Sequence, residues 1–318
     1  SRDGTLASFL YLPGHLRTPL PMRSLPYFLL DVFTNEPFGG NPLAVFPDAD
    51  DVPDELMQKI ANELNLSETT FIQKARAEGS DCTVRIFTPQ SEIPMAGHPT
   101  IGTAYAVLAN RLLDPGQPTH LIFDEGVGPV RVDFEHCEDK PCKLVMHQRP
   151  PQFFEPLDHA LVANALSLNE YDLEPNLPVQ IVSCGFPFIL APARSLDAVR
   201  RAKVRLDLLE SKLGHLESQE LLVFTQETVN RESDIHCRMF APRLGVPEDP
   251  ATGGAHGPLG SYLVRHGLSD GKHIVSEQGY AMGRPSKLVV GIESVDGEIT
   301  DVSVSGECVQ VGEGTIRL

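Results

Sequence analysis

The chain has 318 residues, of which 41% are hydrophobic and 22% charged, so it is long enough to form two compact domains with separate cores. It carries 26 lysines and arginines against 43 aspartates and glutamates, and the net charge of -17 argues against nucleic acid and anionic membrane surfaces as partners. No apolar run reaches the roughly 18 residues that span a bilayer, and no secretory leader with a cleavage site is recognisable. We therefore expect a soluble, cytoplasmic protein.

Residues 1–21 and the cysteines add little to the fold prediction. Residues 1–21 have no clear hydrophobic period and an ordinary domain start follows at Met22, so we interpret them as a leader or an added segment. The cysteines form no CxxC pair and have no histidine at metal-ligand spacing; they are Cys82, Cys137, Cys142, Cys184, Cys237 and Cys308. We expect reduced core thiols and no metal site.

The first half of the chain opens with two strands and a helix. Residues 28–33 and 42–46 are apolar runs on either side of a Gly-Gly-Asn turn, which predicts a hairpin. Residues 53–65 have apolar side chains at helical spacing, with Pro53 and acidic residues in the first turn, where the helix dipole favours anions. This segment is predicted to be an amphipathic helix.

Two further strands and a second helix complete the first half. Residues 69–73 and 83–88 predict strands. The loop after Pro89 then leads into a helix. Its predicted apolar face consists of Ile101, Ala104, Tyr105 and Leu108.

The second half repeats this order from Val179. The repeat predicts a strand pair over 179–192, a helix over 195–209, strands over 220–226 and 235–241, and a helix over 253–264. The order of elements alone therefore indicates an internal duplication.

Two segment matches support the duplication. Residues 85–89 (RIFTP) match residues 238–242 (RMFAP) at an offset of 153, and each match is followed by a proline at the same distance. The same offset aligns Phe71 with Phe224. Residues shared by the two copies are expected to serve the scaffold.

Domain boundaries follow from the duplication. Residues 150–156 lie between the copies and have the proline density of a linker, so we expect an N-terminal domain over 22–150 and a C-terminal domain over 151–318. Residues 288–318 alternate apolar residues with glycine turns and predict closing strands, the last of which can return to the first domain. Any chemistry is expected in the cleft between the copies.

Glu68 is the clearest difference between the copies. It follows a helix and begins a strand, where the offset of 153 places Leu221 in the second copy. A carboxylate at an otherwise apolar strand end would be partly desolvated, which raises its pKa toward the range useful to a general acid/base. The alternative, that Glu68 caps a helix or pairs on the surface, stays open on this feature alone.

A glycine-containing loop precedes the second helix of each copy, as AGHPTIGTA over 96–104 and PEDPATGGAHG over 247–257. N–H groups at a helix N-terminus bind carboxylate or phosphate, and glycine lets a ligand approach the backbone. His98 could add a donor or carry a proton, and Asp249 or Glu248 could supply an acceptor. In a duplicated fold the two helix starts would face each other across the cleft. The predicted substrate-binding residues are Gly97, Thr100, Thr252, Gly253 and Gly254.

Other catalytic motifs are absent from the sequence. The glycine loops follow neither the GxGxxG nor the GxxxxGK[ST] spacing, and no serine stands in a GxSxG elbow. His147, His159 and His236 have no partner residues clustered with them, so we expect surface or core roles for them.

These segments, together with residues 31–46 (DVFTNEPFGGNPLAVF) and 278–288 (QGYAMGRPSKL), resemble the PhzF-like family of phenazine-biosynthesis isomerases and their relatives. The similarity runs from about Tyr27 to the C-terminus. The resemblance implies an α+β protein of two similar domains with the diaminopimelate-epimerase-like fold. Each domain would be a sheet or half-barrel around a central helix, with the site in the cleft between them. The resemblance also implies a cofactor-independent isomerase, typically homodimeric.

The resemblance also implies roles for individual residues. Glu68 in SETTF matches the family's general acid/base, and His98 in AGHPT matches a residue that assists at the substrate. Asp249 in EDPATG matches an acidic group placed against the substrate, and Gly97 matches a backbone contact. The family pattern TGSA reads TGGA here, with Gly254 in place of serine, so one hydroxyl contact with the phenazine substrate is missing.

We therefore predict a metal-free isomerase in which Glu68 removes a proton from one carbon of a small carboxylate-bearing substrate and returns it to another carbon on the same face. A non-catalytic small-molecule-binding or protein-interaction member of the fold is the alternative. An amino-acid epimerase ranks third, because the fold's namesake enzymes use two opposed cysteines and neither helix start contains one.

Overall fold

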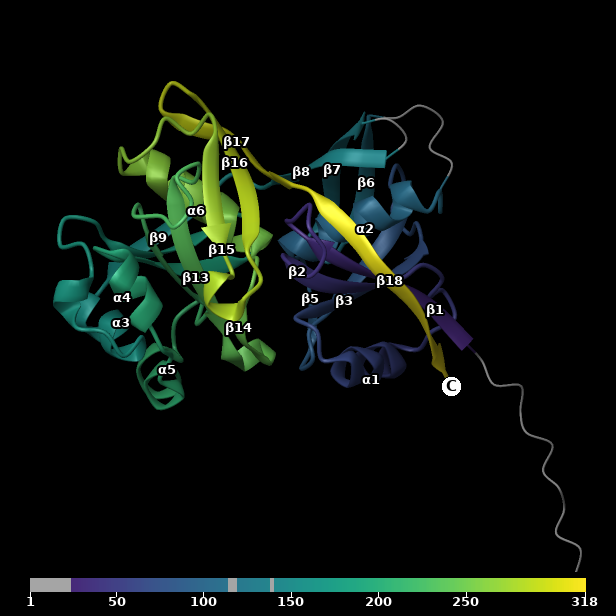
Figure 1. The fold of residues 1–318 in the computed structure, drawn as a ribbon, viewed down its shortest axis with the longest axis horizontal. Helices are drawn as coiled ribbons and strands as arrows, with labels where there is room; N and C mark the ends of the chain where they lie inside the picture. Colours follow the sequence, from purple (N-terminus) through teal and green to yellow (C-terminus); the bar gives the residue numbers. More distant parts are fainter. Residues whose placement is uncertain (1–23, 114–118, 138–139) are drawn as a thin grey trace, which may run out of the picture.

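The first of the two lobes in Figure 1 is built from the N-terminal half of the chain and the final strand. The computed structural model describes residues 24–113, 119–137 and 140–318, so residues 1–21, predicted to be a leader or an added segment, lie outside it. The first lobe consists of β1 (Ser24–Val32), β2 (Asn41–Phe46), α1 (Asp54–Leu64), β3 (Glu68–Lys74), β4 (Cys82–Phe87), β5 (Glu92–Ile93), α2 (Gly97–Ala109), β6 (His120–Glu125), β7 (Gly128–Cys137), β8 (Lys140–Gln148) and β18 (Cys308–Arg317).

The second lobe is built from the remaining elements. It consists of β9 (Gln152–Leu157), α3 (His159–Ala165), η1 (Glu170–Asp172), β10 (Val179–Ser183), β11 (Pro187–Pro192), α4 (Leu196–Arg201), α5 (Leu206–Leu213), β12 (Leu221–Thr225), β13 (Ile235–Ala241), η2 (Pro242–Leu244), β14 (Val246–Asp249), α6 (Gly253–Arg265), β15 (Ile274–Gln278), η3 (Tyr280–Met282), β16 (Ser286–Val295) and β17 (Glu298–Gly306). The predicted hairpins and strands of both halves are present with small shifts of their ends, as are the predicted helices apart from the one over 195–209.

The two lobes have the same strand order. Paired strands run β18, β1, β2, β3, β4, β6, β7, β8 in the first lobe and β9, β10, β11, β12, β13, β15, β16, β17 in the second. The strand pairs β2–β3 and β4–β6 are parallel, as are their counterparts β11–β12 and β13–β15. Antiparallel pairing of β8 with β17 joins the lobes. Figure 1 shows β18, in yellow, crossing to the first lobe, where it pairs with β1.

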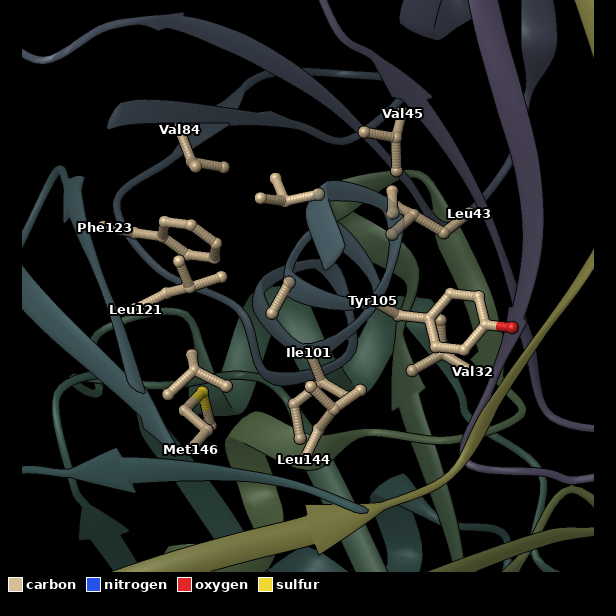
Figure 2. Packing of buried hydrophobic residues seen from close by; sticks show 14 of the residues in the cluster. Val32, Leu43, Val45, Val84, Ile101, Tyr105, Leu121, Phe123, Leu144 and Met146 are labelled. Carbon is tan, nitrogen blue, oxygen red and sulfur yellow. The ribbon is translucent and has the colours of Figure 1, made fainter. Parts of the chain in front are cut away.

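Helix α2 is the core of the first lobe. Side chains from the curved sheet point toward it in Figure 2, among them Leu43, Phe123 and Met146. Residues 97–107 of α2 are all buried, so the predicted single apolar face around Ile101 is wrong in extent. A helix enclosed by a half-barrel is covered on every side and needs no polar face. Helix α6 has the same position in the second lobe, where residues 253–263 are buried.

The outer helices cover the convex side of each sheet. Helix α1 packs on the first sheet with Met57, Ile60 and Ala61 buried, as its apolar spacing predicted. The helix predicted over 195–209 is wrong, because α4 and α5 are separate helices. The chain leaves helical geometry between them, where the N–H of Lys203 and that of Arg205 donate to backbone carbonyls at the end of α3.

The linker predicted over 150–156 is also wrong, because most of it is the strand β9. This strand pairs antiparallel with β10, and in the described residues no other strand pairs with its second edge. An edge strand tolerates Pro156, whose missing N–H faces no partner strand. Strand β9 thus has the place in the second lobe that β18 has in the first.

The alignment of Glu68 with Leu221 is corrected by the strand register. Arg85 pairs with Phe71 across β4 and β3, whereas Arg238 pairs with Val223 across β13 and β12. With the two arginines taken as equivalent, β3 and β12 align at an offset of 152, which places Glu68 on Glu220. A one-residue slip moves every side chain to the opposite face of a strand.

The buried phenylalanines agree with this register. Phe71 packs with the residues under α1, on the outer side of its sheet, whereas Phe224 packs in the cluster around α6, on the inner side. The match of Phe71 with Phe224 at an offset of 153 is therefore a coincidence. A glutamate thus stands at the head of this strand in both copies: Glu68 begins β3, and Glu220 directly precedes β12.

Candidate active site between the lobes

The N-termini of α2 and α6 meet at the boundary between the lobes. A Cβ atom on Gly97 would overlap the backbone of Gly253 and Gly254, so only glycine allows the two helices to approach this closely. Neither helix has a side chain that caps its first N–H groups. Two helix starts therefore direct their positive dipole ends and backbone donors toward the same place, an arrangement that favours a bound anion.

Glu68 begins β3 beside these helix starts. Its Oε2 atom is buried and has no hydrogen-bond partner. Burial and the nearby negative charge of Asp249 raise the pKa of the Glu68 carboxyl well above its usual value. A raised pKa moves a carboxyl group toward the range in which it can both hold and release a proton, as a general acid/base must.

His98 is the second residue of α2 and faces Glu68. Its Nε2 atom lies 3.3 Å from Oε2 of Glu68, but neither atom has a well-aligned hydrogen bond. Burial lowers the pKa of His98 to about 3, so the imidazole is neutral at physiological pH. The pair is therefore a neutral imidazole beside a carboxyl group rather than an ion pair.

Asp249 ends β14 and reaches the same place from the second lobe. Its Oδ1 accepts a hydrogen bond of 2.8 Å from Asn41, and its Oδ2 accepts one of 2.5 Å from the hydroxyl of Thr252. Burial raises the pKa of Asp249 to about 6, although its hydrogen bonds with Thr252, Ser67 and Asn41 oppose the shift. Asn41 and Ser67 belong to the first lobe, so the Asp249 carboxylate ties the lobes together.

Glu68, His98 and Asp249 line a small cavity of about 40 Å³. Apolar side chains form much of its wall, including Phe186, Phe188 and Met239. The predicted site residues that line it are Glu68, Gly97, His98, Asp249, Thr252, Gly253 and Gly254. A larger hollow of about 690 Å³ lies over β16 and β17 and contains none of them.

Thr100 does not line this cavity. Its hydroxyl lies 2.7 Å from the carbonyl oxygen of Ala96 and 2.6 Å from Oε1 of Glu125. Burial raises the pKa of Glu125 to about 8, against the opposing effect of the Thr100 hydrogen bond. The Thr100 hydroxyl has one proton, which can be donated to only one of these two oxygens. If Glu125 is protonated, its carboxyl group donates to the Thr100 oxygen while Thr100 donates to the Ala96 carbonyl, and both contacts are hydrogen bonds. Thr100 thus braces the start of α2.

Gln278 braces the start of α6. Its side-chain amide donates to the carbonyl oxygen of Asp249 at 2.6 Å and to the Thr252 hydroxyl at 3.0 Å, and its carbonyl accepts from the Thr252 N–H. His256 contacts the carbonyl oxygen of Thr252 at 2.8 Å, as Thr100 contacts that of Ala96. The offset of 153 that aligns the two arginines also aligns Glu125 with Gln278. The same position thus braces the helix start in each lobe, with different chemistry.

Three polar residues of the site were missed in the sequence, namely Asn41, Ser67 and Gln278. Asn41 and Gln278 lie inside the two motifs at 31–46 and 278–288, so their place in those motifs was an available signal. Ser67 directly precedes Glu68 and is the first residue of the SETTF motif, so the same kind of signal was available for it.

Among the described residues, one donor atom each from Glu68, His98 and Asp249 lies within 4.8 Å of the others, a spacing that a small cation could bridge. A cation at this place would need the lone pair of His98 Nε2 and an ionised Glu68. The raised pKa of Glu68 opposes that ionisation.

The other histidines singled out in the sequence do not line the cavity, and neither do the cysteines whose side chains are described. His147 contacts Asp133 and Asp301, His159 contacts a backbone carbonyl, and His236 contacts Glu277. Among the cysteines whose side chains are described, Cys82, Cys184 and Cys237 are buried and Cys308 is half-buried, and none of them lines the cavity. The side chains of Cys137 and Cys142 are outside the described part of the chain.

A protein-family model described as phenazine biosynthesis-like protein matches residues 30–314 of this chain. An uncharacterized isomerase of Clostridium acetobutylicum is 35% identical over 93% of this chain and 99% of its own length. The trans-2,3-dihydro-3-hydroxyanthranilate isomerase of Pseudomonas fluorescens is 35% identical over 92% of this chain and 99% of its own.

Solved structures show the same fold. A PhzF-family phenazine biosynthesis protein of Bacillus anthracis is 29% identical with a TM-score of 0.83, over 93% of this chain and 99% of that one. A hydroxyproline epimerase of Agrobacterium vitis is 11% identical with a TM-score of 0.66, over 93% of each chain, and shares the fold alone. The α+β fold of two similar halves, predicted to be diaminopimelate-epimerase-like, is confirmed. Within the described residues, no helix is both long and apolar enough to cross a membrane.

Proposed function

The chain belongs to the phenazine biosynthesis-like protein family and is an isomerase, and we propose that Glu68 is the general acid/base that moves a proton between two carbons of its substrate. The observation that supports this proposal is the environment of the Glu68 carboxyl group. It lines the cavity, its Oε2 has no hydrogen-bond partner, and its pKa is raised well above the usual value by burial. A base near its own pKa accepts and returns a proton with little energetic penalty.

A single carboxyl group suits a proton shift along one face of the substrate. Inverting a carbon needs a base on each face, whereas moving a proton to a neighbouring position needs only one base that takes it and returns it. The other acidic side chain on the cavity wall, Asp249, already accepts hydrogen bonds from Asn41 and Thr252. We therefore assign proton transfer to Glu68 and substrate orientation to Asp249.

The substrate is a small molecule that carries a carboxylate. The starts of α2 and α6 provide backbone donors and positive dipole ends without side-chain caps, which matches a carboxylate group. His98 and the apolar wall around Phe188 would contact the rest of the molecule. The hydroxyanthranilate acted on by the relative from Pseudomonas fluorescens has this chemistry. Gly254 provides no side-chain contact, so a related ring carboxylate with fewer polar groups is the class we expect.

Binding requires the lobes to separate. A cavity of about 40 Å³ has room for about one water molecule, whereas sites for small ligands are typically several hundred Å³. Hydrogen bonds from Asn41 and Ser67 to Asp249 hold the lobes together in this form. We expect the substrate to compete for these contacts as it enters.

Turnover in heavy water tests the assignment of Glu68. A thermal-shift screen of small ring carboxylic acids, with trans-2,3-dihydro-3-hydroxyanthranilate included, selects compounds that stabilise the folded protein. NMR of the reaction should show a new carbon–hydrogen or carbon–deuterium bond at a second carbon with wild type, and none with Glu68→Gln. Undiminished turnover by a folded Glu68→Gln protein would show that another group is the base.

We also propose that the enzyme works without a cofactor and as a homodimer, with domains over 22–150 and 151–318, the last strand of which returns to the first domain. Turnover that survives exhaustive dialysis against a chelator supports the first point. Light scattering coupled to size-exclusion chromatography measures the second, and a monomer at catalytic concentrations would contradict it. Limited proteolysis locates the domain boundary.

A further inference from the structure

Asn41 holds a central position between the groups of the site. It begins β2 and is completely buried. Its Nδ2 atom lies 3.0 Å from Nδ1 of His98, 2.8 Å from Oδ1 of Asp249 and 2.9 Å from the carbonyl oxygen of Ala251. One amide nitrogen therefore faces both polar side chains that accompany Glu68, one from each lobe.

The carbonyl of Ala251 fixes which way the Asn41 amide points. A backbone carbonyl oxygen can only accept a hydrogen bond, so the atom of Asn41 that faces it must be the nitrogen. The opposite orientation would place the Oδ1 of Asn41 against the oxygens of Ala251 and Asp249. The buried Oδ1 has no partner where it now lies, so the three contacts of Nδ2 outweigh that cost.

This orientation determines where His98 carries its proton. A neutral imidazole has one nitrogen that donates and one that accepts. The amide NH2 of Asn41 has two hydrogens for three contacts and no lone pair with which to accept, so an Nδ1–H of His98 would face it without an acceptor. Nδ1 therefore carries the lone pair, shares an amide hydrogen with the oxygens of Asp249 and Ala251, and leaves the ring proton on Nε2. Nε2 is the atom that lies 3.3 Å from Oε2 of Glu68.

We propose that Asn41 is a positioning residue that fixes His98 as the Nε2–H tautomer and so directs an N–H donor at Glu68. The catalytic consequence rests on the proposed function of Glu68. With Nε2 as a donor, His98 stabilises the Glu68 carboxylate or a developing negative charge on the substrate, and it does not compete with Glu68 as a base. The same proton occupies the lone pair that a metal ion would need.

The tautomer is directly measurable in the wild-type protein. The carbon and nitrogen chemical shifts of labelled histidine distinguish the two neutral tautomers from the imidazolium ion, and the signals missing from His98→Gln identify His98. We expect the Nε2–H tautomer at pH 7 without substrate. An Nδ1–H tautomer or an imidazolium ion would overturn the proposal, and the only variant that must fold for this result is His98→Gln, which assigns the signals.

Substitution of Asn41 tests its part in this arrangement. Asn41→Ala removes the donor, so we expect mixed tautomers of His98 and a fall in kcat of about tenfold or more. Asn62→Ala is the matched control, because Asn62 also donates to a backbone carbonyl, that of Pro89, but lies away from the cavity. A pure Nε2–H tautomer with unchanged kcat in Asn41→Ala would refute the role of Asn41.

The two hypotheses fail separately. The tautomer is measured without turnover, so loss of the Glu68 assignment leaves it unchanged. If Asn41→Ala lowers kcat and Glu68→Gln does not, the donor at His98 serves a different base. If the wild-type tautomer is Nδ1–H while Glu68→Gln is inactive, the proposed function stands and the role of Asn41 falls.

Discussion

Glu68 in the first lobe and Glu220 in the second stand at the head of equivalent strands, but their carboxylates have different surroundings. Glu220 accepts hydrogen bonds from the Ser218 hydroxyl at 2.8 Å and from the Gln219 N–H at 3.0 Å. Oε2 of Glu68 is buried without any such partner. A glutamate at this position is therefore part of the shared frame, and the two lobes differ in whether hydrogen-bond donors surround its carboxylate.

At two other equivalent positions the lobes also differ in the side chain that they supply to the site. The strand pairing that places Ile93 opposite Ile86 in the first lobe places Asp249 opposite Met239 in the second. The second residue of the central helix is His98 in the first lobe and Gly254 in the second. Each lobe thus supplies polar groups where the other has an apolar or absent side chain, and the cavity is chemically asymmetric although its frame is duplicated.

The largest expected effect comes from exchanging the two glutamates for glutamine one at a time. Glu68→Gln should lower kcat about a thousandfold, because general acid/base catalysis typically contributes 10²–10⁴. Glu220→Gln is the matched control and should stay within about twofold of wild type, since its carboxylate is already occupied by local donors. Steady-state kinetics measure both. Equal losses in the two variants would erase the distinction between the lobes.

The close approach of the helix starts predicts the next largest effect. Gly97→Ala forces a Cβ into the backbone of Gly253 and Gly254, and should cost about 1–3 kcal/mol of stability and about a hundredfold in kcat/KM. A Cβ at Gly254 has no neighbour closer than 3.6 Å, so Gly254→Ala serves as the control and should fold normally. Thermal denaturation and kinetics decide. Normal stability of Gly97→Ala would mean that the helices can separate freely.

Glu125→Gln gives the first lobe the residue type that Gln278 provides in the second. Folded Glu125 keeps its proton up to about pH 8, whereas the unfolded chain releases it near 4.5, so this residue makes the folded state less stable as pH rises between those values. The upper bound is about 1.4 kcal/mol per pH unit. The variant should therefore melt at a higher temperature than wild type at pH 8, with the difference shrinking toward pH 5. Parallel melting curves for wild type and variant across this range would contradict the buried-acid interpretation.

The smallest effect is expected from Gly254→Ser. The space around Gly254 admits a Cβ at ordinary contact distance from Phe188 and Gly97, so stability should change by about 0.5 kcal/mol or less. The added hydroxyl lies at the cavity and should improve KM by up to about tenfold for substrates with an extra polar group. Competition between two ring carboxylates that differ by one hydroxyl measures the change. No shift in preference would show that the substrate does not reach this position.

Local sequence patterns determined most of the elements of the fold. Apolar spacing and the terminal residues located α1, with Pro53 and Asn65 as its caps. Alternating apolar runs located the strands, and glycines located the starts of α2 and α6. Glu68 was singled out by its apparent mismatch with Leu221, which the strand register overturns, and by its place in the SETTF motif.

Tertiary structure alone decided how those elements align and what surrounds each polar group. The offset between β3 and β12 is 152 rather than 153, which makes Glu68 equivalent to Glu220. This offset depends on which face of β12 meets α6, and the sequence match between Phe71 and Phe224 cannot reveal it. The complete burial of α2 depends on a sheet that closes around it, including β18 from the far end of the chain. Asn41 and Asp249 are 208 positions apart, so their contact exists only because two lobes meet. The protonation of the site depends on such contacts, because a pKa and a tautomer are properties of the surroundings and not of the residue.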